Sequence, residues 1–207
     1  MKAKTIIFDL DGTLIDTMGI FAEIASRLIA GRYNISEEEA CALYLKTSGI
    51  PFAKQLDILF PGDTLNKESA LLYEETKTKK LRTVEVSMLP DEAEALRELA
   101  SRGYRLGISS SEIQEIVDRF VLRSGLPFLY KLGYRDGFAK GKEHFSYILA
   151  KGGGAPEDII FIGDSPGDME KAHESGVGFI GKLGTFKKED FKDTRTIESL
   201  RELLHIL

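Results

Sequence analysis

The stretch Thr5-Ile6-Ile7-Phe8-Asp9-Leu10-Asp11-Gly12-Thr13 decides the fold of this 207-residue chain. Its first four residues are β-branched or aromatic, and such a run predicts a buried strand. The strand delivers the carboxylates of Asp9 and Asp11 to its end, where Gly12 allows the chain to turn sharply. In an open α/β sheet that edge binds ligands. Because neighbouring buried carboxylates repel, the arrangement favours the binding of a cation and a phosphate over a role in stability.

Two further strands are expected to end in polar side chains. The apolar run 159–162 is followed by Gly163, Asp164 and, four residues later, Asp168. The run 104–108 is followed by Ser109, Ser110 and Ser111. Ser111 with Gln114 also matches a capping box, which predicts a helix over 112–123.

The order of the elements predicts an α/β protein with an inserted helical segment. Apolar residues recur at helical spacing between residues 16 and 82, which predicts four helices, and strand patterns are absent there. From Pro90 onward, expected helices alternate with strands at 104–108, 129–134, 159–162 and 177–180. We therefore expect a Rossmann-like parallel sheet core with helices on both faces, formed by residues 1–15 and 83–207, and an all-helical cap domain formed by residues 16–82.

Composition narrows the class of protein. The net charge is −5, without a basic cluster, so nucleic acid is not an expected partner. Cys41 is the single cysteine, which predicts no disulfide and a reducing, cytoplasmic location. No apolar stretch approaches the length of a membrane span, and the N-terminus has no signal-peptide pattern. The three histidines show no metal-ligand spacing.

The first motif, Asp9-x-Asp11-Gly12-Thr13, resembles that of the haloacid dehalogenase-like hydrolase superfamily. Gly163-Asp164 with Asp168 is similar to its fourth motif, and Ser109 stands where its second motif has Ser or Thr. The third motif is a lysine before a helix, and both Lys140 and Lys142 fit its spacing, with a slight preference for Lys140. Many relatives have Lys-Pro at this place, whereas here Gly141 follows Lys140, so the loop geometry is expected to differ.

The resemblance implies a Mg²⁺-dependent phosphatase that acts through an aspartyl-phosphate. Asp9 would be the nucleophile, and Asp11 would protonate the leaving oxygen and then take a proton from water. Mg²⁺ would be held by Asp9, the Asp11 carbonyl and Asp164, with Asp168 holding the metal shell or orienting the lysine. The residues expected to bind the substrate phosphate are Ser109, Ser110, Lys140 (or Lys142), Gly12 and Thr13.

The expected substrate is a small phosphorylated metabolite of the sugar phosphate or phosphoglycolate type, hydrolysed by a monomer or weak homodimer. One alternative is a phosphomutase of the β-phosphoglucomutase type, which keeps the core motifs. The Arg that such mutases carry shortly after a glycine of the cap is absent after Gly49. A dehalogenase would need no acid at position 11. A non-catalytic binding module with this fold usually lacks a motif carboxylate, and all four are present here.

Overall fold

The structure is a computed structural model that describes residues 4–84, 88 and 90–207. It divides into two compact units, one of Met1–Asp16 with Val86–Leu207 and one of Thr17–Glu85. The sequence expectation placed these boundaries after residues 15 and 82. Each unit is described by itself below.

The first unit is built around a parallel sheet whose strand order is β3-β2-β1-β4-β5-β6. β1 (Thr5–Phe8) lies in the middle and pairs with β2 (Arg105–Ile113) on one side and β4 (Ile159–Gly163) on the other. All four β1 residues are buried, as expected for a central parallel strand covered on both faces. The outer strands are β3 (Phe128–Tyr134), β5 (Gly178–Lys182) and the two-residue β6 (Thr196–Ile197).

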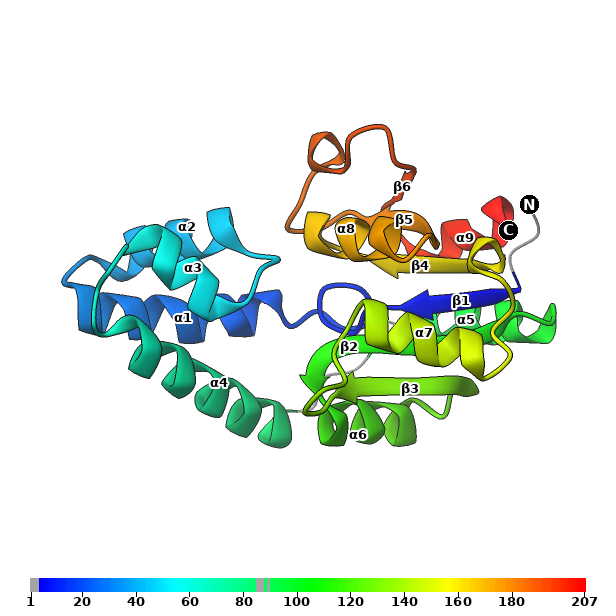
Figure 1. The fold of residues 1–207 in the computed structure, drawn as a ribbon, viewed down its shortest axis with the longest axis horizontal. Helices are drawn as coiled ribbons and strands as arrows, with labels where there is room; N and C mark the ends of the chain where they lie inside the picture. The colour runs from blue at the N-terminus through cyan, green and yellow to red at the C-terminus, as the bar shows by residue number, and fades with distance from the viewer. Residues whose placement is uncertain (1–3, 85–87, 89) are drawn as a thin grey trace. The chain divides into compact units, whose positions relative to one another are not determined.

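Helices cover both faces of this sheet, which confirms the expected Rossmann-like α/β core. α7 (Lys142–Ala150) and α8 (Pro166–Glu174) lie on one face, and α5 (Pro90–Ser101) and α9 (Leu203–Ile206) lie on the other (Figure 1). α6 (Gln114–Ser124) packs against β2 and β3. A cluster of buried side chains joins α7 and α8 to the sheet and includes Ile7, Phe145, Ile148, Phe161 and Met169.

The described residues of the second unit, 17–84, form four helices, as the sequence predicts for this segment. They are α1 (Met18–Tyr33), α2 (Glu37–Thr47), α3 (Phe52–Leu59) and α4 (Asn66–Thr83). Ser36 caps α2, since its hydroxyl accepts the Glu39 amide proton. Stacked rings of Phe52 and Tyr73, with centroids 4.1 Å apart, help to hold α3 against α4.

The structure corrects the expected end of the strand at 104–108. β2 continues through the three serines to Ile113, and α6 begins at Gln114 rather than after a Ser111 cap. Gln114 uses its side chain for tertiary contacts, donating to the Lys131 carbonyl and accepting from the Gly133 amide. Pairing with β3 therefore outweighs the local capping pattern. β6 and the elements after it were not expected from the sequence.

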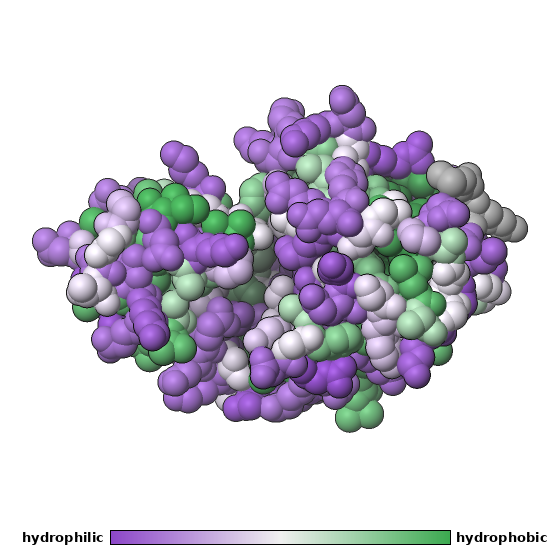
Figure 2. Space-filling model, in the orientation of Figure 1, coloured by the Kyte–Doolittle hydropathy of each residue, from purple (hydrophilic) through white to green (hydrophobic). Residues whose placement is uncertain are grey.

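The surface shows no single dominant apolar area in the view drawn. The face shown in Figure 2 is mainly hydrophilic, with hydrophobic residues in small scattered groups. Within the described part of the chain, no helix is both long enough and apolar enough to cross a membrane.

Candidate active site

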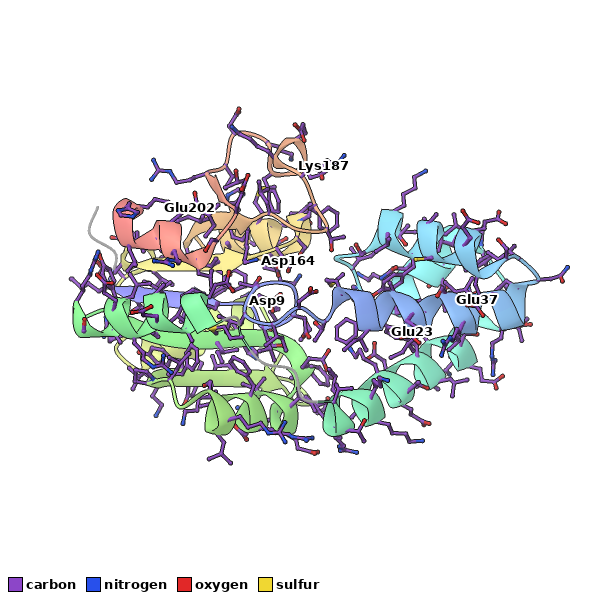
Figure 3. The ribbon with its side chains drawn as sticks, turned by 180° about the vertical axis from the view of Figure 1, so that it is seen from behind. Asp9, Glu23, Glu37, Asp164, Lys187 and Glu202 are labelled. Atoms are coloured by element: carbon purple, nitrogen blue, oxygen red, sulfur yellow. The ribbon has the colours of Figure 1, made fainter. Side chains whose placement is uncertain are left out.

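The candidate site lies at the carboxyl edge of the sheet, where β1 and β4 end side by side. Phe8 pairs with Ile162, so the chain leaves the two strands one residue later at Asp9 and two residues later at Asp164. Figure 3 shows these two aspartates near each other at that edge. Both are almost fully buried, with 7% and 5% of their surface exposed. The tertiary structure thus brings together the acidic ends of two strands far apart in sequence.

Lys140 joins two of the buried carboxylates. Its Nζ lies 2.8 Å from Asp9 Oδ2 and 2.6 Å from Asp168 Oδ1, and its side chain is 7% exposed. Such short contacts between buried charges are charge-assisted hydrogen bonds and fix the position of all three side chains. Lys142, the other candidate, is exposed at the first position of α7. Of the two lysines, the structure brings Lys140 to Asp9.

The backbone directly after Lys140 has an unusual conformation. Gly141 has φ +113° and ψ −128°, a conformation that side-chain-bearing residues rarely adopt. Proline, with φ fixed near −65°, cannot take this conformation. A proline at position 141 would therefore require a different backbone here.

Asp164 approaches the loop after β1 at a point where only glycine fits. A Cβ atom placed on Gly12 would lie 2.2 Å from Asp164 Oδ2, and Gly12 also has φ +74°. The amide of Gly12 donates to the Ile15 carbonyl at 2.8 Å. The expectation that this amide binds the phosphate stays a prediction. Gly12 also lets the Asp164 carboxylate come close to the backbone.

Asp168 is held by the start of α8. Ser165 caps this helix, since its Oγ accepts from the Asp168 amide at 3.2 Å and donates to Asp168 Oδ2 at 2.8 Å. A Cβ atom on Gly163 would lie 2.6 Å from Asp168 Cβ, so the glycine before Asp164 is needed for this close approach. One oxygen of Asp168 thus contacts Ser165 and the other contacts Lys140. Sequence reasoning did not identify Ser165.

The donor set suits a hard divalent cation. One oxygen from each of Asp9, Asp164 and Asp168 lies within 4.8 Å of the other two, and all three residues are buried. Carboxylate oxygens are the ligands that Mg²⁺ prefers. Lys140 contacts Asp9 and Asp168, whereas none of the described ion pairs includes Asp164. The sequence expectation was that Asp168 holds the metal shell or orients the lysine. Its carboxylate lies in the same group as the other two and also contacts Lys140.

The remaining expected residues lie in two places. Asp11, half-buried, and Thr13, buried, belong to the loop between β1 and α1. Ser109 and Ser110 lie on β2 and are fully buried. Ser110 Oγ accepts from the Glu112 amide at 3.0 Å. Ser109 Oγ lies 2.9 Å from Nδ1 of His144, a residue that the sequence did not connect to the site.

Burial and mutual repulsion shift the acid–base properties of the cluster. Burial raises the pKa of Asp9 from 3.8 to about 6, with Lys140 lowering it and Asp168 raising it. The pKa of Asp164 is raised well above its ordinary value by burial and then by the charges of Asp9 and Asp168. Burial alone would lower the pKa of Lys140, but Asp168 and Asp9 more than offset this and raise it. The metal-free cluster therefore resists full ionisation.

This raised pKa predicts that Asp9→Asn stabilises the metal-free protein at high pH. Between pH 3.8 and about 6 the folded state binds more protons at Asp9 than the unfolded state, so wild-type stability falls as pH rises through this range. The Asn amide of the variant does not ionise, so the variant does not show this decrease in the free energy of unfolding, which reaches roughly 3 kcal/mol in wild type. Thermal unfolding in chelator should show the variant gaining over wild type from pH 4 to pH 8. A difference in melting temperature between the variant and wild type that stays constant from pH 4 to pH 8 would contradict the raised pKa of Asp9.

Comparison with known proteins identifies relatives of the whole chain. The model of a family described as "Haloacid dehalogenase-like hydrolase" matches residues 6–182. A "Pyrophosphatase PpaX" of Oceanobacillus iheyensis is 26% identical over 227 residues, covering 100% of this chain and 98% of that protein. A "Phosphoglycolate phosphatase" of Synechococcus elongatus is 26% identical over 176 residues, covering 84% of this chain and 81% of that protein. A haloacid dehalogenase-like family hydrolase from Streptococcus pneumoniae, of solved structure, has a TM-score of 0.81 at 22% identity, with 99% of each chain covered.

Proposed function

Because this chain belongs to the haloacid dehalogenase-like hydrolase family and is an enzyme of its phosphatase type, we propose that it hydrolyses a small phosphorylated metabolite through an aspartyl-phosphate. The observation that carries this proposal is the contact of Lys140 with Asp9 and Asp168, beside Asp164. A buried carboxylate with an ammonium group at 2.8 Å is suited to attack an anionic phosphate, because the ammonium offsets the repulsion between them.

The proposed reaction has two steps. In the first, an Asp9 oxygen attacks phosphorus, the bond from phosphorus to the leaving oxygen breaks, and Asp11 protonates that oxygen. In the second, water attacks the aspartyl-phosphate, gives a proton to Asp11 and releases inorganic phosphate and free Asp9. Lys140, Ser109 and the Thr13 amide would hold the phosphoryl oxygens, where charge is spread in the transition state.

Mg²⁺ is the proposed cofactor. Asp9, Asp164 and the Asp11 carbonyl would hold it, with Asp168 close enough to take part through its own oxygen or through a bound water. When bound, Mg²⁺ offsets the repulsion between the Asp9 carboxylate and the phosphate.

Removing the metal is expected to abolish activity and lower stability. Turnover of 4-nitrophenyl phosphate should vanish in chelator and return with Mg²⁺, whereas Ca²⁺ should inhibit because it takes more ligands at longer distances and can engage both Asp9 oxygens. Mg²⁺ should also raise the melting temperature of wild type and much less that of Asp164→Asn. Full activity in chelator would instead favour metal-free chemistry of the dehalogenase kind.

The substrate is proposed to be a small phosphate compound of the kinds named for the relatives. These relatives are named as a pyrophosphatase and phosphoglycolate phosphatases. We propose that the unit Thr17–Glu85 acts as a cap and selects among such compounds. The test is a panel of phosphoglycolate, pyrophosphate and sugar phosphates, ranked by kcat/KM with wild type in Mg²⁺. A preferred substrate should exceed 4-nitrophenyl phosphate by at least about tenfold, since binding energy outside the phosphate adds to transition-state stabilisation.

A further inference from the structure

His144 is a buried residue whose side chain contacts the proposed phosphate site. It lies on α7, and its Nδ1 is 2.9 Å from Ser109 Oγ on β2. Both residues are 0% exposed. Ile108 pairs with Phe8, so Ser109 and Asp9 follow at matching places on neighbouring strands. The imidazole is thus one hydrogen bond away from a hydroxyl beside the proposed nucleophile.

The imidazole of His144 is neutral at pH 7. Burial lowers its pKa from 6.5 to about 4, and the positive charges of Lys140 and Arg135 lower it further, against the opposing effect of the Gly133 and Phe138 carbonyls. A neutral ring carries one proton, on Nδ1 or on Nε2, and the other nitrogen is an acceptor. The position of this proton decides which of His144 and Ser109 is the donor.

The surroundings of Nε2 favour the proton on Nδ1. Nε2 is buried, and no described residue lies in hydrogen-bonding geometry with it. The Gly133 and Phe138 carbonyls come close enough to the ring to raise its pKa, but they do not reach that geometry at Nε2. A proton on Nε2 would leave a buried N–H without an acceptor in good geometry, which costs the desolvation of that donor. A proton on Nδ1 is shared with Ser109 Oγ at 2.9 Å, and Nε2 then keeps only a lone pair. The ring of Phe138, with its centroid 4.5 Å from that of His144, helps to fix the ring plane.

We propose that His144 is a positioning residue that donates its Nδ1 proton to Ser109 Oγ and leaves the hydroxyl proton of Ser109 for a phosphoryl oxygen. This inference rests on the proposed function, because it assigns Ser109 to the phosphate. In the opposite arrangement Ser109 would donate to His144 and turn an oxygen lone pair toward the anionic substrate, which would repel it. The histidine therefore sets the direction of a hydrogen bond without entering the reaction.

The position of the proton can be measured without any turnover. In ¹⁵N-labelled wild type at pH 7, nitrogen shifts and long-range ring couplings distinguish the two tautomers, and His144→Asn identifies the signal among three histidines. We expect protonated Nδ1 and bare Nε2, with no titration between pH 6 and pH 8. A proton on Nε2 would overturn the inference. This result does not depend on whether the protein is a phosphatase.

Kinetics then test whether His144 acts through Ser109. Asn can place an amide N–H near the position of Nδ1, whereas Phe has no donor. With 4-nitrophenyl phosphate and Mg²⁺, His144→Phe should lower kcat/KM by roughly 10- to 100-fold, because a phosphoryl donor loses its alignment. His144→Asn should stay within about threefold of wild type. In a Ser109→Ala background, His144→Phe should cause no further loss, whereas additive losses would overturn the inference.

A matched control separates positioning from packing. Ile148 is also fully buried on α7 and belongs to the core cluster, with no part in the proposed site. Ile148→Val should lower the melting temperature and leave kcat/KM unchanged, since it removes only buried volume. If Ile148→Val lowers kcat/KM as much as His144→Phe, a general loss of packing explains both. If wild type hydrolyses no phosphate ester, the proposed function fails, and the tautomer measurement still decides the His144 hydrogen bond.

Discussion

Asp9→Asn is expected to reduce phosphate-ester hydrolysis by several orders of magnitude while leaving the protein folded. The Asn amide is not a nucleophile, and in a covalent mechanism the whole reaction passes through the attacking oxygen. The site tolerates the change because Asn has the same size and Lys140 keeps its contact with Asp168 at 2.6 Å. Initial rates with 4-nitrophenyl phosphate and with the best metabolite substrate, both in Mg²⁺, measure the loss.

Asp136→Asn is the matched control for this variant. Asp136 lies in the exposed loop between β3 and α7, so the same change of atoms there should leave activity near wild type. Circular dichroism and thermal unfolding of both variants show whether the fold is retained. Activity of Asp9→Asn within tenfold of wild type would refute the assignment of Asp9 as nucleophile. Loss of activity in both variants would point to a general effect of removing negative charge.

Lys140→Ala and Lys142→Ala are expected to differ by roughly 100- to 1000-fold in kcat/KM, the scale of a removed donor to the transition state. Lys140 is buried with its ammonium within 2.8 Å of Asp9 and 2.6 Å of Asp168, so its loss removes the positive charge nearest the nucleophile. Lys142 is exposed on α7, and losing its charge should change the rate little.

Melting temperatures show whether a loss of activity in these lysine variants comes from a loss of stability. Lys140→Ala leaves buried carboxylates without their ammonium partner, so it should lower the melting temperature in chelator. Mg²⁺ should restore much of that stability, because the cation binds the same carboxylates, while turnover stays low. Lys142→Ala should melt like wild type in both conditions. Near wild-type activity in both variants would place the substrate-binding lysine elsewhere in the chain.

The local sequence determined the elements that end in the site. The apolar runs before Asp9 and Asp164 predict strands because central parallel strands are buried on both faces, and the structure has strands there. The alternation of helices and strands predicted the parallel sheet, and the helical pattern between residues 16 and 82 predicted four helices. These features depend on periodicity and turn residues, which are readable over ten or so neighbouring positions.

The tertiary structure alone decided which side chains meet. Lys140 and Lys142 are two positions apart and both fit the expected spacing, with a slight preference for Lys140, and the tertiary structure brings Lys140 to Asp9. The pairing of β2 with β3 extended the strand past Ser109 to Ile113, where a local capping pattern had predicted a helix beginning after Ser111. The contact of His144 with Ser109 joins a helix to a strand 35 residues earlier, and no local pattern specifies such a contact. Hydrogen bonds and ion pairs of this kind depend on how whole elements pack, so their residue types can be read from the sequence but their partners cannot.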